Sequence, residues 1–142
     1  MATKKLSDRK PAGFFVAHLP SGTWALAIFI LCILPGDALL NIDFWTIDWE
    51  DKAAHLGVFG LLGLLMVWGE WRRKGILNPR PAVKVMIVVL CLLFGMLIEI
   101  IQNEFIPTRY GSAGDAIADF LGALLGTLLA PYALRLVKKI RQ

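Results

Sequence analysis

The apolar residues of this chain gather into four long blocks, separated by short polar segments. The blocks cover residues 23–40, 53–71, 83–101 and 116–134. Each approaches the ~20 residues that an α-helix needs to cross a bilayer core of ~30 Å. A soluble domain of this size needs no apolar block of that length. The pattern therefore predicts an all-α protein, a four-helix transmembrane bundle that forms one domain over residues 1–142.

The first block carries two further signals. Pro35 and Gly36 lie near its end and predict a kink or the end of the regular helix, because proline lacks a backbone N–H. A basic start before an apolar run also resembles a secretory signal, but no small-x-small cleavage site follows it. We therefore expect a retained helix, with residues 14–19 lying along the membrane interface ahead of it.

Composition and charge agree with a membrane protein. Only 18% of the 142 residues are charged, against roughly 25% in soluble domains. The net charge of +4 does not indicate nucleic-acid binding, because the basic residues form no stripe. Thirteen of the 15 Lys and Arg flank the apolar blocks, within residues 4–10, 72–84 and 135–141. The positive-inside rule then places both termini and the 72–84 loop in the cytoplasm, for a multi-pass protein of the cell membrane.

Small residues recur at helical spacing in two of the blocks. Ala118, Gly122 and Gly126 stand four apart, and glycines occupy every third position of residues 57–63. Such residues let helices approach closely. We favour packing within one bundle as the explanation, and a homodimer seam through Gly122 and Gly126 is the alternative.

Polar residues interrupt the apolar blocks at one level. They are Asp51, Lys52, His55, Glu99, Gln102, Asp115 and Asp119, with Arg109 in the loop between the last two blocks. In the predicted topology all of them lie within one or two helical turns of the outer surface. An ionisable group costs up to ~2.5–3.5 kcal/mol at the bilayer centre, so a pocket shared among helices is the most favourable arrangement. The sequence therefore predicts an outward-facing polar pocket.

Each of these residues also has a structural explanation. Asp51 and Asp115 stand at the starts of apolar blocks and can be helix N-caps. Glu99 or Asp119 can pair with Lys52 or Arg109 in a buried ion-pair network that fixes helix register. His55 alone can be a core histidine. Because the whole set converges at one depth, we favour a functional pocket for the set.

Several chemistries suit such a pocket. His55 and Glu99, with either Asp115 or Asp119, can bind a divalent cation such as zinc or manganese, although their spacing matches no established metal signature. Glu99 and Asp115 can instead act as an acid/base pair, with His55 as base or ligand. Arg109 and the Gly/Ser-rich turn after it can hold a phosphate or carboxylate.

In their order and spacing these residues resemble the VanZ-like family of small integral membrane proteins. The shared pattern runs Asp51-Lys52-x-x-His55, Glu99-x-x-Gln102, Phe105-Ile106-Pro107-Thr108-Arg109-x-Gly111-Ser112 and Asp115-x-x-x-Asp119-x-x-Gly122-x-x-x-Gly126. The family usually carries Asn at the position of Asp119, so this chain has an extra carboxylate there. The resemblance implies a multi-span helical protein of the cell envelope, related to proteins associated with glycopeptide (teicoplanin) resistance. The resemblance does not imply any particular reaction.

Three functions are compatible with these residues. The first is binding of a lipid-linked or cell-wall component, with contacts from Asp51, Lys52, Gln102, Arg109 and Asp119. The second is a membrane-embedded hydrolase or transferase acting on an envelope glycan or lipid, with Glu99, Asp115 and His55 as its catalytic residues. The third, a proton-coupled transporter, is disfavoured because no polar path crosses the predicted bundle.

Overall fold

The computed structural model describes residues 12–34, 48–106 and 112–140. This part of the chain is helical and contains no strand. Its helices are α1 (Phe14–Ile33), α3 (Asp48–Lys74), α4 (Pro81–Phe105) and α5 (Ala113–Ile140). All four are long and apolar enough to cross a membrane. For the described residues, the prediction of an all-α fold with four helices long and apolar enough to span a membrane is confirmed.

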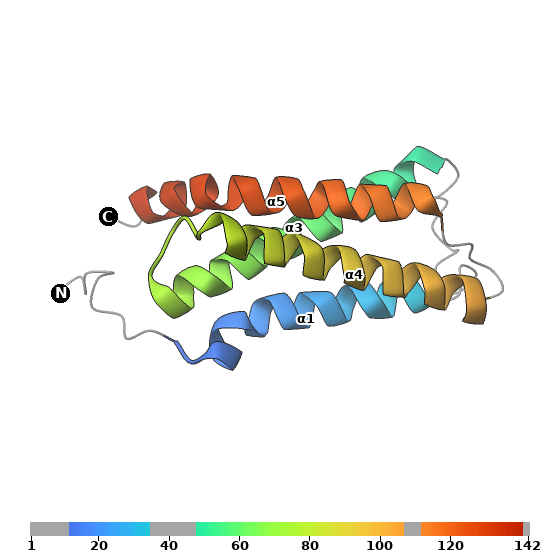
Figure 1. Cartoon of the computed structure of the whole chain (residues 1–142), viewed down its shortest axis with the longest axis horizontal. Helices are drawn as coiled ribbons and strands as arrows, with labels where there is room; N and C mark the ends of the chain where they lie inside the picture. The colour runs from blue at the N-terminus through green and yellow to red at the C-terminus, as the bar shows by residue number, and fades with distance from the viewer. Residues whose placement is uncertain (1–11, 35–47, 107–111, 141–142) are drawn as a thin grey trace.

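The first helix occupies different residues from those expected. Residues 14–19, which we expected along the interface, form the first turns of α1, and the helix ends at Ile33. Pro20 lies inside α1 and removes one helical hydrogen bond, and the first turns tilt away from the rest of the helix (Figure 1). Leu34 is extended, as a residue before proline prefers, so Pro35 determines where the helix stops. Residues 35–40 of the predicted span lie outside the described part.

The helices alternate in direction, which separates the molecule into two ends. The start of α1, the end of α3, the start of α4 and the end of α5 meet at one end (Figure 1). We call this the basic end, since its helix termini carry Arg72, Arg73, Lys74, Arg80, Lys84, Arg135, Lys138 and Lys139. At the opposite end, here called the polar end, α3 and α5 begin and α1 and α4 finish. Within the described residues, the basic side chains of the 72–84 and 135–141 clusters therefore share one end of the bundle.

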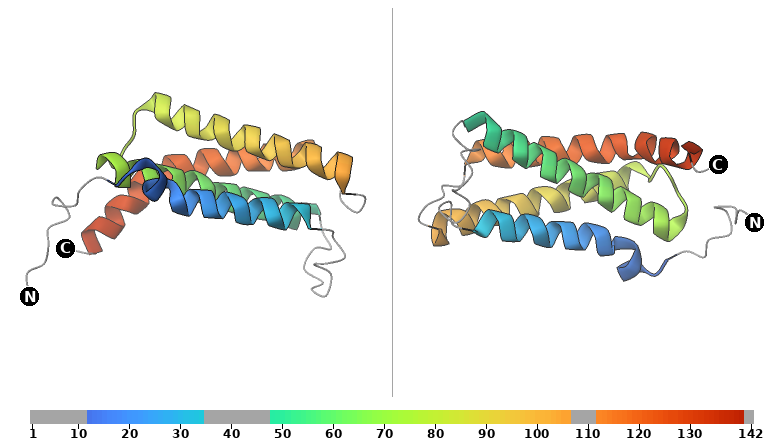
Figure 2. Two further views of the ribbon diagram at one scale, coloured as in Figure 1. Left: turned by 90° about the horizontal axis from the view of Figure 1, so that it is seen from below. Right: turned by 180° about the vertical axis from the view of Figure 1, so that it is seen from behind.

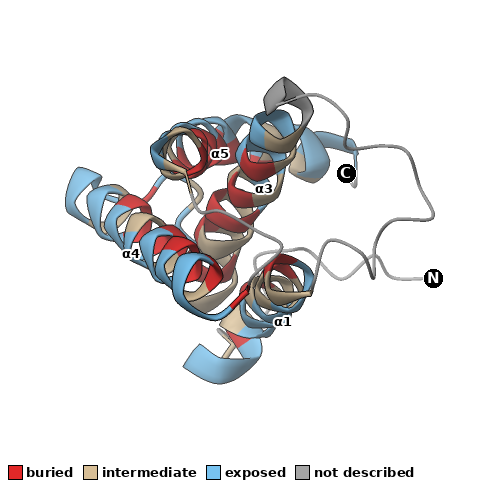
Figure 3. Cartoon of the chain, turned by 90° about the vertical axis from the view of Figure 1, so that its right-hand side faces the viewer, coloured by how far each residue is buried: buried red, intermediate tan, exposed pale blue. Residues whose placement is uncertain are grey.

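Helix α3 packs against each of the other three helices, and its buried face lies at the centre of the bundle (Figure 3). Its most extensive contact is with α5, where glycines allow the backbones to touch. A Cβ at Gly122 would overlap the carbonyl of Leu56, and one at Gly126 would overlap the carbonyl of Gly60. Only glycine fits at these two positions. Packing within the bundle thus uses both glycines, and a homodimer seam through them would require this contact to open.

Apolar side chains cover the outside of the bundle as well as its interior. Phe59, Ile98 and Val67 are buried, whereas leucines along the outer face of α5, such as Leu125 and Leu129, are exposed. Lipid tails are as apolar as such side chains, so close packing and polar contacts must hold the helices together. Figure 2 shows α5 bending toward its end, where Pro131 lies inside the helix. The exposed apolar surface agrees with a protein that lies in lipid.

Candidate functional site

His55 and Asp119 join α3 to α5 at the polar end. The imidazole Nδ1 of His55 lies 2.9 Å from Oδ1 of Asp119, whose side chain is fully buried. The other ring nitrogen, Nε2, lies 4.0 Å from Oδ1 of Asp51, which is half exposed. Oδ2 of Asp119 lies against Gly95 of α4, where a Cβ would overlap it. The imidazole therefore stands between two carboxylates, and Gly95 provides the space for the deeper one.

Glu99 and Asp115 meet at Ser112, the residue before the first turn of α5. The Ser112 hydroxyl accepts a hydrogen bond from the Asp115 N–H at 3.1 Å and donates one to Oδ2 of Asp115 at 2.8 Å. The Ser112 N–H donates to Oε2 of Glu99 at 2.7 Å. Both carboxylates are therefore stabilised by the N-terminus of α5. The helix is capped by Ser112, and the expectation that Asp115 is itself the N-cap is wrong.

Lys52 and Gln102 have partners other than those expected. Nζ of Lys52 lies 3.9 Å from Oδ1 of Asp115. Glu99 has no cation within ion-pair distance among the described side chains. The amide of Gln102 donates a 3.0 Å hydrogen bond to the carbonyl of Cys32, one of the last carbonyls of α1. Gln102 thus holds the end of α1 against α4. Arg109, the predicted anion ligand, lies outside the described residues.

Two buried carboxylates at this end keep an oxygen without a hydrogen-bond partner in the described structure: Oε1 of Glu99 and Oδ2 of Asp119. Oδ1 of Asp115 also lacks a hydrogen bond, but Lys52 lies near it. A buried acceptor without a partner costs free energy, and native proteins contain few of them. These oxygens are where the site has unused binding capacity. We call the whole set the polar cluster: Asp51, Lys52, His55, Glu99, Ser112, Asp115 and Asp119.

The contacts of two residues that shape this cluster, Ser112 and Gly95, were not predicted from the sequence. Ser112 stands three residues before Asp115, a spacing typical of a capped helix start, so it was recognisable in the sequence. Gly95 gives no such signal, because its contact is with Asp119 on another helix. Its role becomes visible only when α4 and α5 are packed together.

A second group of ionisable side chains lies at the basic end. Oε1 of Glu70 accepts a hydrogen bond from Arg73 at 2.8 Å and lies 3.4 Å from Nε2 of His18 on α1. The other oxygen of Glu70 lies 3.0 Å from Nζ of Lys74. Both oxygens of this buried carboxylate thus meet positive or protonatable groups. The group joins α1 to α3 and leaves Glu70 with no free oxygen for a ligand.

Comparison with known protein families gives a match for this chain. The family described as VanZ/LLP1 matches residues 24–136, which include all seven residues of the polar cluster. No curated protein and no solved structure gives a significant match. The match covers well over half of the chain and includes α3 and α4 in full together with half of α1 and most of α5. The protein therefore belongs to the VanZ-like family of membrane proteins.

Proposed function

We propose that this protein binds a lipid-linked or cell-wall component of the cell envelope through its polar cluster. In this proposal the bundle lies in the cytoplasmic membrane with both termini inside. The eight basic residues of the basic end favour that orientation by the positive-inside rule. The polar cluster then faces outward, toward the side on which cell-wall material is found.

The observation that carries the proposal is the pair of unpartnered oxygens on Glu99 and Asp119. A buried carboxylate in a membrane-spanning bundle lowers the stability of the fold. Its free oxygen can accept a hydrogen bond, so the site suits a ligand that donates hydrogen bonds. Sugar hydroxyls, peptide amides and ammonium groups are such donors. A ligand without them gains nothing from this cluster, so the polar head group of an envelope component provides the specificity.

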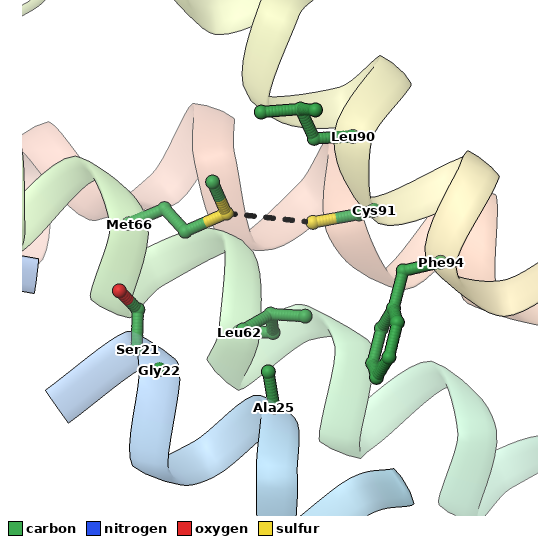
Figure 4. A pocket seen from close by; sticks show the side chains of 8 residues that line it. All are labelled: Ser21, Gly22, Ala25, Leu62, Met66, Leu90, Cys91 and Phe94. Atoms are coloured by element: carbon green, nitrogen blue, oxygen red, sulfur yellow. Dashed lines mark hydrogen bonds between the residues drawn. The ribbon is translucent and has the colours of Figure 1, made fainter. Parts of the chain in front are cut away.

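An apolar pocket offers a place for the lipid part of such a ligand. It lies between α1, α3 and α4, has a volume of about 220 Å³, and is lined mostly by apolar side chains (Figure 4). Leu62 of its lining follows His55 by two turns of α3, or ~10 Å along the helix. On the opposite wall, Cys91 donates a 3.8 Å hydrogen bond to the sulfur of Met66. A polyprenyl or acyl chain in this pocket would leave its head group near the polar cluster.

The alternative function is a membrane-embedded hydrolase or transferase acting on an envelope glycan or lipid. It is favoured by the hydrogen bond between His55 and Asp119, because a carboxylate that orients an imidazole makes it an effective base. Asp115 is already bound by Ser112 and lies near Lys52, so Glu99 is the better-placed acid. A contribution to glycopeptide (teicoplanin) resistance would follow if either activity alters the cell-wall component that the antibiotic recognises.

A thermal-shift experiment in lipid nanodiscs tests the proposal. The probes are a polyprenyl-linked disaccharide and the same polyprenyl lipid without the sugar. We expect the sugar-bearing lipid to raise the melting temperature further in wild type and in the exposed control Glu104→Gln, but not in Glu99→Gln. Equal shifts from the two lipids in all three proteins would contradict the proposal. Mass spectrometry of the lipid after incubation distinguishes turnover from binding.

A further inference from the structure

We infer that His55, Glu99 and Asp119 form a binding site for a divalent metal cation of the Zn²⁺ or Mn²⁺ class. The three residues come from α3, α4 and α5. One ring nitrogen of the histidine and one oxygen of each carboxylate lie within 4.8 Å of one another. One imidazole and two carboxylates are ligands that both metals accept in proteins.

Burial makes a cation the natural partner of these groups. The exposed fractions of His55, Glu99 and Asp119 are 6%, 8% and 0%. Each of the two carboxylates has one oxygen bound, by the Ser112 N–H or the imidazole, and one oxygen without a hydrogen bond. Buried charges in proteins are paired or coordinate metals. A metal ion would engage the open oxygens and compensate both negative charges at once.

A neighbouring set of possible metal ligands has less need of a cation to compensate its charge. Asp51, His55 and Asp115 also lie within 4.8 Å of one another. However, Asp51 is half exposed and can be hydrated, while Lys52 lies 3.9 Å from Asp115 and already supplies a positive charge. All three residues of the set formed with Glu99 and Asp119 are buried, and among the described residues no lysine or arginine lies within ion-pair distance of its carboxylates. We therefore assign the metal to that set.

The inference rests on the proposed function for its biological role. In the metal-bound protein, the open oxygens of Glu99 and Asp119 would hold the envelope ligand through the metal rather than directly. The polar cluster is rich in carboxylates, which would repel a phosphate-bearing head group. Three protein ligands leave a coordination position open on a four-coordinate metal. A phosphate or hydroxyl oxygen of the envelope ligand can take that position. The metal would thus turn an acidic cluster into one that accepts an anionic lipid.

Metal binding can be measured directly on the full chain. Tag-free protein in nanodiscs is stripped with EDTA, dialysed against Zn²⁺ and assayed for bound metal, and Co²⁺ replaces Zn²⁺ for visible absorption spectra. We expect one metal per chain in wild type and affinities at least about tenfold weaker in Glu99→Gln and Asp119→Asn. The control Glu104→Gln, which is exposed on the same helix as Glu99 and lies outside the polar cluster, should bind as wild type does.

Wild-type protein without stoichiometric metal would overturn the inference, as would loss of binding in Asp51→Asn but not in Asp119→Asn. Melting curves of the variants confirm that each is folded before its affinity is measured. The two proposals fail separately. If the stripped protein binds the sugar-bearing lipid but no metal, only the metal site is wrong. If it binds metal but does not distinguish the two lipids, only the envelope ligand is wrong.

Discussion

Nδ1 of His55 lies 2.9 Å from Oδ1 of Asp119, next to a close backbone approach between α3 and α5. Leu56, which follows His55, touches Gly122, which lies one turn beyond Asp119 on α5. The glycine contact therefore fixes the separation of α3 and α5 where the histidine and the aspartate meet. Packing and site chemistry depend on the same pair of helices.

Gly122→Ala should lower stability and disturb the site together. The new Cβ would overlap the carbonyl of Leu56, so α3 and α5 must move apart. Overpacking of this kind costs about 1–3 kcal/mol. Melting of the purified protein in detergent measures the loss. The matched control is Gly57→Ala, whose Cβ meets nothing within 4 Å. This control should be neutral or more stable by up to ~1 kcal/mol, and equal losses in the two variants would contradict the packing.

Two substitutions at Asp119 should separate its hydrogen bond from its charge. Asp119→Asn keeps an oxygen that can accept from the His55 imidazole and removes a buried charge, so stability should hold or rise. Asp119→Ala leaves a buried ring nitrogen without its partner, which costs about 1–3 kcal/mol. Denaturant unfolding in detergent compares the two variants with wild type. If the free energy of unfolding falls equally in both variants, the fold depends on the charge of Asp119 and not on its hydrogen bond.

Gln102→Met should loosen the end of α1. The amide of Gln102 donates to the carbonyl of Cys32, and its loss removes the contact that holds this turn against α4. We expect the thiol of Cys32 to react several-fold faster with a maleimide, while Cys91, deeper in the bundle, stays protected. Mass spectrometry of labelled peptides follows both thiols in one sample. Unchanged labelling of Cys32 would show that other contacts hold the helix end.

The orientation of the bundle is testable with reporter fusions. The basic residues of the basic end predict that a fluorescent protein fused after residue 142 matures inside the cell. The same reasoning predicts that alkaline phosphatase fused there stays inactive. Active phosphatase with no fluorescence would reverse the topology and place the polar cluster on the cytoplasmic side.

The sequence predicted which polar residues meet, but not how they meet. His55, Glu99, Asp115 and Asp119 converge as their common depth in the spans indicated. The depth of each residue within its span follows from the sequence, because the rise per residue of an α-helix is constant. The capping position of Ser112 was readable from its spacing to Asp115. The contact of Gly95 with Asp119 was not, because it depends on how α4 and α5 pack together. The start of α1 was also misplaced, because Pro20 and its polar neighbours resemble a boundary although the helix continues through them.

We propose that Glu99 serves ligand binding rather than folding, and a melting experiment on one variant distinguishes the two roles. Glu99→Gln and wild type, both free of metal, are unfolded in the same detergent. The glutamine oxygen can still accept from the Ser112 N–H, and a buried charge disappears. We therefore predict a melting temperature equal to or above that of wild type. A loss of ~3 kcal/mol or more would contradict the account and would identify Glu99 as one arm of a structural ion pair.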